Sequence, residues 1–138
     1  MTEIGAYQEH HFAGVDQLWR AVFPEDPPRN QAAAAIPKKL AMEDGLFFVA
    51  EDPAGNVIGT AMAGWDGHRG WLYSVAVDPA MRRQAIGQAL IETAIEALRN
   101  LGCNKVNLQI RAGNEKVAAF YRSLEFEVEP RTSMGRSI

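Results

Sequence analysis

The chain has 138 residues, of which 47% are apolar and 22% charged; this composition suits one folded domain and excludes a disordered or fibrous protein. Its 14 basic and 17 acidic residues give a net charge of −3, which argues against a protein that coats nucleic acid. The single cysteine, Cys103, excludes an intramolecular disulfide and a cysteine-based zinc site. We expect one domain over residues 1–138, with no metal.

Hydrophobic periodicity predicts alternating helices and strands along the chain. Apolar residues recur at three- and four-residue spacing from Phe12 to Val22 and from Ile86 to Leu101, which is typical of helices that bury one face. A helix over 31–42 contains Pro37, which must kink or divide it. The expected elements, in chain order, are a strand over 3–8, helices over 12–22 and 31–42, strands over 46–50, 57–63 and 71–77, a helix over 86–101, a strand over 105–110, a helix over 114–124, and short strands over 126–129 and 133–136.

This order predicts the fold class. The strands over 71–77 and 105–110 are joined by a helix, so we expect them to be parallel. The remaining hairpins predict antiparallel strands. We therefore expect an α+β fold with a mixed, mostly antiparallel sheet of about six to seven strands, a central parallel pair and helices on both faces.

The turn between residues 77 and 86 has the features of an anion site. The first N–H groups of a helix lack intrahelical partners and lie at the positive end of the helix dipole. Arg82 and Arg83 add charged donors, and the small residues Ala85, Gly87 and Ala89 let a phosphate group approach the backbone. The segment predicts a phosphate-bearing ligand, yet the same residues would also serve to cap a surface turn and pack the helix.

Two motifs resemble the GNAT superfamily of acetyl-CoA-dependent N-acetyltransferases. The first, Val75-x-Val77-x-Pro79 followed by Arg82-x-x-Ala85-x-Gly87, is similar to the family's coenzyme-binding motif, Gln/Arg-x-x-Gly-x-Gly/Ala. The second consists of Asn114, Val117-Ala118-Ala119, Phe120-Tyr121 and Leu124-Glu125-Phe126. The element order agrees over residues 3–136, and the stretch 64–70 resembles a small bacterial subgroup, the YpeA type.

Two residues depart from the family pattern. Ala85 replaces the first glycine of the coenzyme motif and places a methyl group where the pyrophosphate would approach. Glu125 replaces the glycine of a Leu-Gly-Phe element; if that position requires positive φ, the replacement costs on the order of 1 kcal/mol. We expect Ala85 to weaken coenzyme binding and Glu125 to affect the end of the helix.

The resemblance implies that acetyl-CoA, as cosubstrate, lies between two parallel strands that separate, here residues 72–77 and 105–110. The pantetheine amides would pair with the backbone of Val75 and Val77, and the pyrophosphate would accept N–H groups from residues 82–88. The coenzyme-binding residues implied in this way are Val75, Ala76, Val77, Arg82, Arg83, Gln84, Ala85, Ile86, Gly87, Gln88, Asn114 and Tyr121.

The resemblance also implies catalytic roles. Tyr121 matches the position of the family's general acid, which protonates the departing thiolate; otherwise it is an aromatic packing partner of Phe120. Some family members use a strand glutamate as the base, and Gln109 stands at that position here. Asp66 and His68 are the candidate bases, with Glu51 as a further alternative.

The implied function is transfer of an acetyl group from acetyl-CoA to a primary amine, by direct transfer in a ternary complex. The acceptor is an amine-bearing small molecule or a peptide or protein amine. Acidic residues at its entrance would favour a cationic amine, although Glu25 and Asp26 fit a solvated loop better. Two alternatives stay open: a non-catalytic acyl-CoA-binding or regulatory module, and an interaction protein that keeps only the fold.

The remaining expectations concern location and assembly. The sequence begins without a basic segment followed by an apolar run, and it has no apolar stretch of about 20 residues. We therefore expect a cytoplasmic protein with no membrane and no nucleic-acid partner. Exposed strand edges and aromatic residues make a homodimer reasonable.

Overall fold

The structure, a computed structural model, describes residues 1–82 and 85–138. These residues form two compact units, Met1–Leu108 and Gln109–Ile138.

The first unit contains a five-stranded sheet with the order β1-β2-β3-β4-β5. The first four strands pair antiparallel, and β4 and β5 pair in parallel. Strand β2, between β1 and β3, is buried along most of its length, as its run of consecutive apolar residues predicts for a strand covered on both faces. The strands are β1 (Glu3–Ala6), β2 (Phe47–Glu51), β3 (Val57–Trp65), β4 (Gly70–Val77) and β5 (Val106–Asn107).

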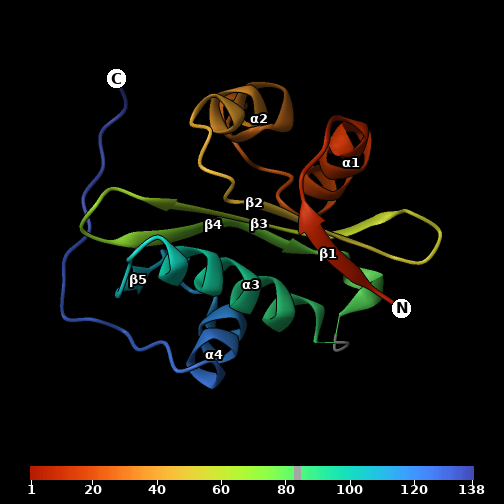
Figure 1. Cartoon of the computed structure of the whole chain (residues 1–138). Coiled ribbons are helices and arrows are strands. Elements are labelled where there is room, and N and C mark those ends of the chain that lie inside the picture. Colours follow the sequence, from red (N-terminus) through yellow and green to blue (C-terminus); the bar gives the residue numbers. More distant parts are fainter. Residues whose placement is uncertain (83–84) are drawn as a thin grey trace. The chain divides into compact units, whose positions relative to one another are not determined.

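Helices cover both faces of this sheet (Figure 1). On one face lie α1 (Phe12–Val22) and α2 (Ala32–Ala41), and on the other lies α3 (Ile86–Asn100). Short 3-10 turns precede α1, α2 and α3: η1 (Glu9–His11), η2 (Pro28–Asn30) and η3 (Pro79–Met81). Pro37 lies inside α2 without dividing it, because Ala32 and Ile36 bury the same helix face against the core.

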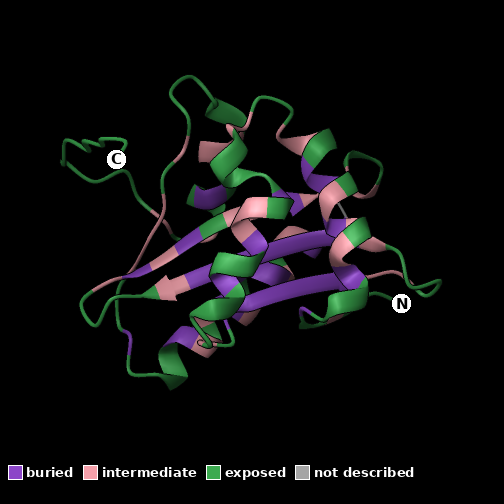
Figure 2. Cartoon of the chain, turned by 90° about the horizontal axis from the view of Figure 1, so that it is seen from above, coloured by how far each residue is buried: buried purple, intermediate pink, exposed green. Residues whose placement is uncertain are grey.

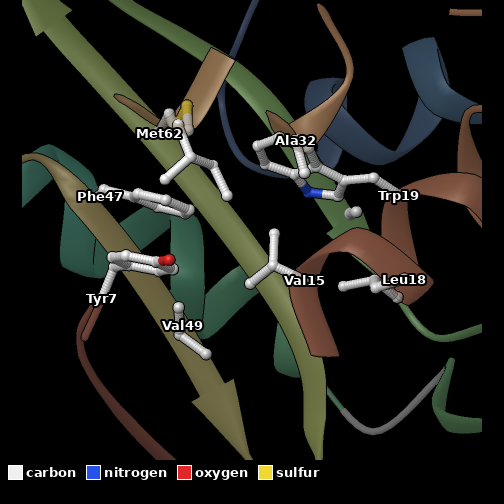
Figure 3. Packing of buried hydrophobic residues seen from close by; sticks show 10 residues of the cluster. Tyr7, Val15, Leu18, Trp19, Ala32, Phe47, Val49 and Met62 are labelled. Carbon is white, nitrogen blue, oxygen red and sulfur yellow. The ribbon is translucent and has the colours of Figure 1, made fainter. Parts of the chain in front are cut away.

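The core between the sheet and the helices α1 and α2 is built from apolar side chains of both layers. Figure 3 shows the rings of Tyr7 and Phe47 side by side, with Val15, Leu18 and Trp19 of α1 facing them. The Tyr7 and Phe47 rings are stacked, with centroids 4.5 Å apart. In Figure 2 long stretches of the sheet are purple, in agreement with the burial of β2 and β3, whereas β1 is mostly exposed.

Helix α3 approaches the opposite face of the sheet closely. Its buried residues, Ile86, Leu90, Ile91, Ala94 and Leu98, follow the spacing of one helix face. A Cβ atom at Gly59 of β3 would lie 2.7 Å from Leu90 Cδ1, so only glycine permits this contact. The close packing fixes the beginning of α3 beside the end of β4.

Strand β4 contains a β-bulge. Met62 of β3 faces Tyr73 and Thr60 faces Ala76, so two residues of β4, Ser74 and Val75, lie opposite Ala61. Ser74 has a φ of 50°, in the left-handed region.

Hydrogen bonds on either side of the bulge show its effect. The Gly70 N–H donates to Lys105 O, at the edge of β4 that faces β5, whereas the Asp78 N–H donates to Ile58 O, on the β3 side. Gly70 and Asp78 are eight residues apart, so in a regular strand their N–H groups would point to the same edge. The extra residue of the bulge therefore reverses the edge to which each following N–H group points.

The second unit contains one helix, α4 (Glu115–Ser123). Asn114 is its N-cap, and its side-chain oxygen accepts a hydrogen bond from the Val117 N–H at 3.3 Å. The sequence predicted both the helix and this cap. No strand forms over 125–138, where Val128 and Met134 are largely exposed and so bury no apolar face.

The expected fold class is confirmed, with a smaller sheet than expected. The described residues form five strands, and the parallel pair lies at the edge of the sheet instead of its centre. β5 covers Val106–Asn107 only, whereas the alternating pattern had predicted a strand over 105–110. Within the described residues, no helix is long and apolar enough to cross a membrane.

Candidate functional site

The end of β4 presents an open backbone edge. β5 pairs only with Gly70 and Trp71, so beyond Trp71 this edge of β4 has no strand partner within the described residues. Because the bulge inverts the alternation, Val75 and Val77 direct their N–H and C=O groups to the open edge, and Ala76 directs its own to β3. An extended ligand with amide groups can pair with such an edge as an added strand would.

The open edge leads directly into the turn before α3. Asp78 caps this turn, since its Oδ1 accepts the Ala80 N–H at 2.9 Å and its carbonyl accepts the Met81 N–H at 2.8 Å. Arg82 follows in an extended conformation with its side chain exposed. The predicted residues Arg83 and Gln84 lie outside the described residues.

The first turn of α3 carries no acidic residue. Ala85, its N-cap, is exposed and adopts a left-handed conformation with φ 60° and ψ 17°, and its carbonyl accepts the Ala89 N–H at 3.0 Å. The N–H groups of Ile86, Gly87 and Gln88 precede the first intrahelical bond and lie at the positive end of the dipole. This arrangement suits a phosphate group, as the sequence predicted.

Two hydrogen bonds, the first of them buried, support the bulge from within. The Trp19 Nε1–H donates to Thr60 Oγ1 at 2.9 Å, and the Thr60 hydroxyl donates to the Ser74 carbonyl at 2.9 Å. Sequence reasoning missed this contact, because it joins three elements distant along the chain. A serine within an otherwise apolar strand was its one visible signal.

The candidate bases Asp66 and His68 lie in the tight loop between β3 and β4. The Asp66 Oδ1 accepts the N–H groups of His68 and Arg69, each at 2.7 Å. These backbone bonds, that of Arg69 first, hold the pKa of Asp66 below its usual value. Five residues of strand separate Gly70 from Val75, or about 16 Å, so the loop lies far along β4 from the open edge.

Glu51, the further alternative, is engaged with two histidines. His11 is buried and hydrogen-bonded through Nε2 to Glu51 Oε1, and His10 Nε2 lies 3.9 Å from the same oxygen. Among the described residues these three form the one group with the donor atoms for a metal ion. However, His11 Nδ1 accepts the Gln8 N–H at 2.9 Å, which places the ring proton on Nε2. That proton fits a hydrogen bond to Glu51 and opposes metal ligation by the same atom.

A groove lies between α1 and the segment that leads into α2. Its volume is about 280 Å³, and its lining includes Trp19, Phe23, Asp16, Arg20 and Asp26. Asp16 forms an ion pair with Arg20 at 3.0 Å. Trp19 thus lines the groove and also contacts Thr60 beneath it.

Tyr121 lies on α4, in the second unit. It is 8% exposed and packs edge-on against Phe126, with ring centroids 5.5 Å apart, and beside Phe120 at 5.2 Å. Burial raises the pKa of Tyr121 to about 12. The hydroxyl therefore keeps its proton throughout the neutral range.

Comparisons with known proteins place this architecture in a family. A model of the acetyltransferase (GNAT) family matches residues 12–126. The chain is 38% identical over 127 residues to an acetyltransferase of Sodalis glossinidius, covering 92% of this chain and 88% of that protein. It is 34% identical over 136 residues to an acetyltransferase of Pectobacterium atrosepticum, covering 99% and 95% respectively.

A similar fold occurs in the aminoglycoside N-acetyltransferase AAC(6')-Iy solved in complex with CoA, with a TM-score of 0.81, 21% identity, and coverage of 99% of this chain and 95% of that one. The chain belongs to the GNAT acetyltransferase family. This confirms the resemblance and the expected enzyme class, an acyltransferase.

Proposed function

We propose that the protein is an N-acetyltransferase that moves the acetyl group of acetyl-CoA to a primary amine. The observation that carries this proposal is the open backbone edge of β4, which runs into an α3 N-terminus with no acidic residue. The edge matches the amide-bearing pantetheine chain, and the helix end matches the pyrophosphate. The family match and the coenzyme in the structural neighbour support the same ligand.

In this proposal the coenzyme follows β4. Its pantetheine amides pair with Val75 and Val77 on either side of Ala76, and its pyrophosphate accepts N–H groups of the turn and the first turn of α3. The residues proposed for that contact are Arg82, Arg83, Gln84, Ala85, Ile86, Gly87 and Gln88, with Asn114 near the pantetheine. Arg82 adds a charged donor.

The proposed chemistry is a direct transfer in a ternary complex. The uncharged amine nitrogen attacks the thioester carbonyl, the carbon–sulfur bond breaks, and the thiolate takes the proton of the Tyr121 hydroxyl. The amine loses one proton to water, and the Tyr121 phenolate regains a proton from water. Tyr121 is protonated at neutral pH, and burial, which raises its pKa to about 12, makes its hydroxyl a weaker donor than a free tyrosine. No side-chain base is assigned, because Asp66 and His68 lie far along β4 and Glu51 bonds to His11.

The acceptor in this proposal is a cationic amine of a small molecule or peptide. The structural neighbour named above is an aminoglycoside N-acetyltransferase, and aminoglycosides carry several such amines. The groove between α1 and α2 is lined by Asp16, which pairs with Arg20, and by Asp26, beside the aromatic rings of Trp19 and Phe23. Acidic and aromatic surfaces attract ammonium groups before they lose a proton.

The first test is binding and turnover by the whole chain. Acetyl-CoA at 100 times its Kd should stabilise the protein by about 2.7 kcal/mol in thermal unfolding. Free-thiol release is then measured across a panel of aminoglycosides, polyamines, peptides and lysine derivatives. No thermal shift at millimolar acetyl-CoA refutes the proposal, and binding without thiol release across the panel favours a non-catalytic acyl-CoA-binding module.

A pair of variants locates the coenzyme. Arg82→Ala should weaken acetyl-CoA binding about tenfold, since a hydrogen bond to a charged group contributes about 1.5 kcal/mol. Arg99→Ala removes the same charge at the opposite end of α3, where Arg99 pairs with Glu96, and should leave the affinity unchanged. Equal effects of the two variants would contradict the proposed pyrophosphate position.

A further inference from the structure

We propose that Thr60 is a positioning residue: its hydroxyl, oriented by Trp19, holds the bulge of β4 in place and so selects the backbone groups that β4 presents to the coenzyme. This inference rests on the proposed function, because the selected groups are those proposed to pair with acetyl-CoA. Thr60 itself touches no reacting atom in this proposal.

The chemistry of the two donors fixes the direction of the contact. An indole N–H can only donate, so the Trp19 Nε1–H at 2.9 Å occupies a lone pair of Thr60 Oγ1. The single hydroxyl proton of Thr60 is then free to point at the Ser74 carbonyl, also 2.9 Å away. Thr60 is 0% and Trp19 3% exposed, so water does not compete for the bond between them, whereas Ser74 is half-buried.

The bulge needs such support. Ser74 adopts a φ of 50°, which costs a non-glycine residue on the order of 1–2 kcal/mol. A bulge residue also leaves the regular ladder, and its carbonyl must find another partner if it is buried. Thr60 supplies that partner from the neighbouring strand.

The bulge in turn decides the register of the open edge. In a regular strand the alternation would turn Val75 and Val77 toward β3 and Ala76 toward the open edge. Holding Ser74 in place therefore keeps the N–H and C=O groups of the two valines available to a ligand. The side chains of the valines themselves play no part in this.

The hydrogen bond from Trp19 to Thr60 also connects the sheet to helix α1. Trp19 belongs to α1 and lines the groove proposed for the acceptor. One indole thus contacts both the groove and, through Thr60, the strand that binds the coenzyme. The position of α1 and the conformation of β4 are linked by these two hydrogen bonds.

The test compares three hydroxyl variants. Thr60→Val keeps the shape but removes both hydrogen bonds, Thr60→Ser keeps the hydroxyl, and Thr93→Val is the matched control. Thr93 on α3 also donates its hydroxyl to a carbonyl, that of Ala89 at 2.8 Å, without contacting β4. Amide hydrogen exchange is measured first, without ligand, followed by acetyl-CoA affinity, kcat and the KM of the amine.

The three variants should differ in a specific pattern. In Thr60→Val the amides of Ala76 and Asp78, which face β3, should exchange about tenfold faster, because the bulge opens locally. Acetyl-CoA affinity or kcat should fall at least about tenfold, as expected for a displaced binding edge, with a smaller change in the KM of the amine. Thr60→Ser and Thr93→Val should stay near the wild type in both measurements.

Several outcomes would overturn the inference. Equal exchange of the Ala76 and Asp78 amides in Thr60→Val and Thr93→Val excludes this role of Thr60, whatever ligand the protein binds. Should Thr60→Val fail to fold, Trp19→Phe takes its place, since it removes the hydrogen bond from Trp19 to Thr60 and leaves the Thr60 hydroxyl. Unchanged amide exchange and kinetics in that variant also contradict the proposed role of Thr60. A wild-type protein that does not bind acetyl-CoA refutes the proposed function. The exchange measurement needs no ligand, so it still tests whether Thr60 holds the bulge in place.

Discussion

Four described residues other than glycine adopt a positive φ: Glu43, Ser74, Ala85 and Glu125. Such conformations cost roughly 1–2 kcal/mol for residues with a Cβ atom, and they persist only where the surroundings hold them. Ser74 and Ala85 lie at the two ends of the segment proposed to bind the coenzyme. The strain therefore coincides with the place where the backbone itself is proposed to act.

Ala85 allows a direct test of this strain. With φ 60° and an exposed side chain, Ala85→Gly should raise the free energy of unfolding by about 1 kcal/mol. Removing the methyl group should also tighten acetyl-CoA binding, because the pyrophosphate can approach the backbone more closely. Urea unfolding and ligand titration measure the two effects.

The control for Ala85→Gly is a glycine in the interior of the same helix. Ala97→Gly should lower the free energy of unfolding by about 1 kcal/mol, the usual cost of glycine in a helix. Opposite signs for the two variants support strain at Ala85. A loss of stability in both would show that the left-handed conformation of Ala85 is not a source of strain.

Glu125 shows how far the sequence could predict the backbone conformation of a single residue. The departure from a family glycine raised the question of a positive φ, and the structure gives 70°. The Phe126 N–H donates to Tyr121 O at 3.1 Å and the Glu125 N–H to Arg122 O at 3.0 Å, the pattern of a Schellman helix end. The need for glycine was readable from the motif, but the hydrogen bonds that impose it were not.

At the scale of elements, α2 is anchored to the sheet by a buried lysine. Lys39 is 7% exposed; its ammonium group forms an ion pair with Asp44 at 2.9 Å and donates to the Ala63 carbonyl. It also lies 5.3 Å from the ring centroid of Tyr73. One cation thus connects α2, the loop before β2 and two strands.

Replacement of this lysine should be costly. Lys39→Met leaves the Ala63 carbonyl and the Asp44 carboxylate without their partner, so the free energy of unfolding should fall by about 2–4 kcal/mol. Lys38→Met changes the neighbouring, exposed lysine and should have little effect. Thermal and urea unfolding check both variants, and a small loss in Lys39→Met would mean that water replaces the missing contacts.

Most helices and strands were predictable, because their signals are local. The apolar spacing in α1 and α3 gave their positions, and Asn114 gave the beginning of α4. The bulge was not predictable, since it depends on Thr60 of another strand and Trp19 of a helix. Likewise, alternation predicted a strand over 105–110, but pairing with β4 ends at Asn107, and alternation carries no information about when a partner strand diverges.

For the proposed site too, features with a local sequence signal were predictable and distances between separate segments were not. The motif residues Arg82, Ala85 and Gly87 pointed to the turn before α3, where the structure shows an acid-free helix end. The candidate bases Asp66 and His68 were chosen for their side-chain chemistry, which says nothing of distance. The structure places them in the loop before β4, about 16 Å or more along the strand from Val75.

At the scale of the whole molecule, local charge matters more than the net charge of −3. A polyanionic coenzyme is repelled by an acidic protein at long range, but salt screens this repulsion beyond about 8–10 Å. Near the end of α3, the helix dipole and Arg82 dominate instead. The acidic residues Asp16 and Asp26 line a separate groove, where a cationic acceptor would meet them.

The titration of buried tyrosines gives the molecule a predictable response to alkaline pH. Burial raises the pKa of Tyr121 to about 12, and burial with the charge of Glu9 raises that of Tyr7. A folded-state pKa above the unfolded value of 10.0 favours the protonated, folded protein. This contribution is complete below pH 10 and is lost as the pH rises from about 10 to about 12.

Tyr121→Phe tests this response and the catalytic proposal together. A difference of about two pKa units corresponds to about 2–3 kcal/mol, so the wild type should lose up to that amount of stability between pH 10 and 12 relative to the variant. Tyr73→Phe, at an exposed tyrosine, is measured in parallel. At neutral pH, loss of the general acid should lower kcat about 100-fold with the fold intact. Unchanged turnover in Tyr121→Phe, together with the expected change in alkaline stability, would make this tyrosine a packing residue and remove it from the proposed chemistry.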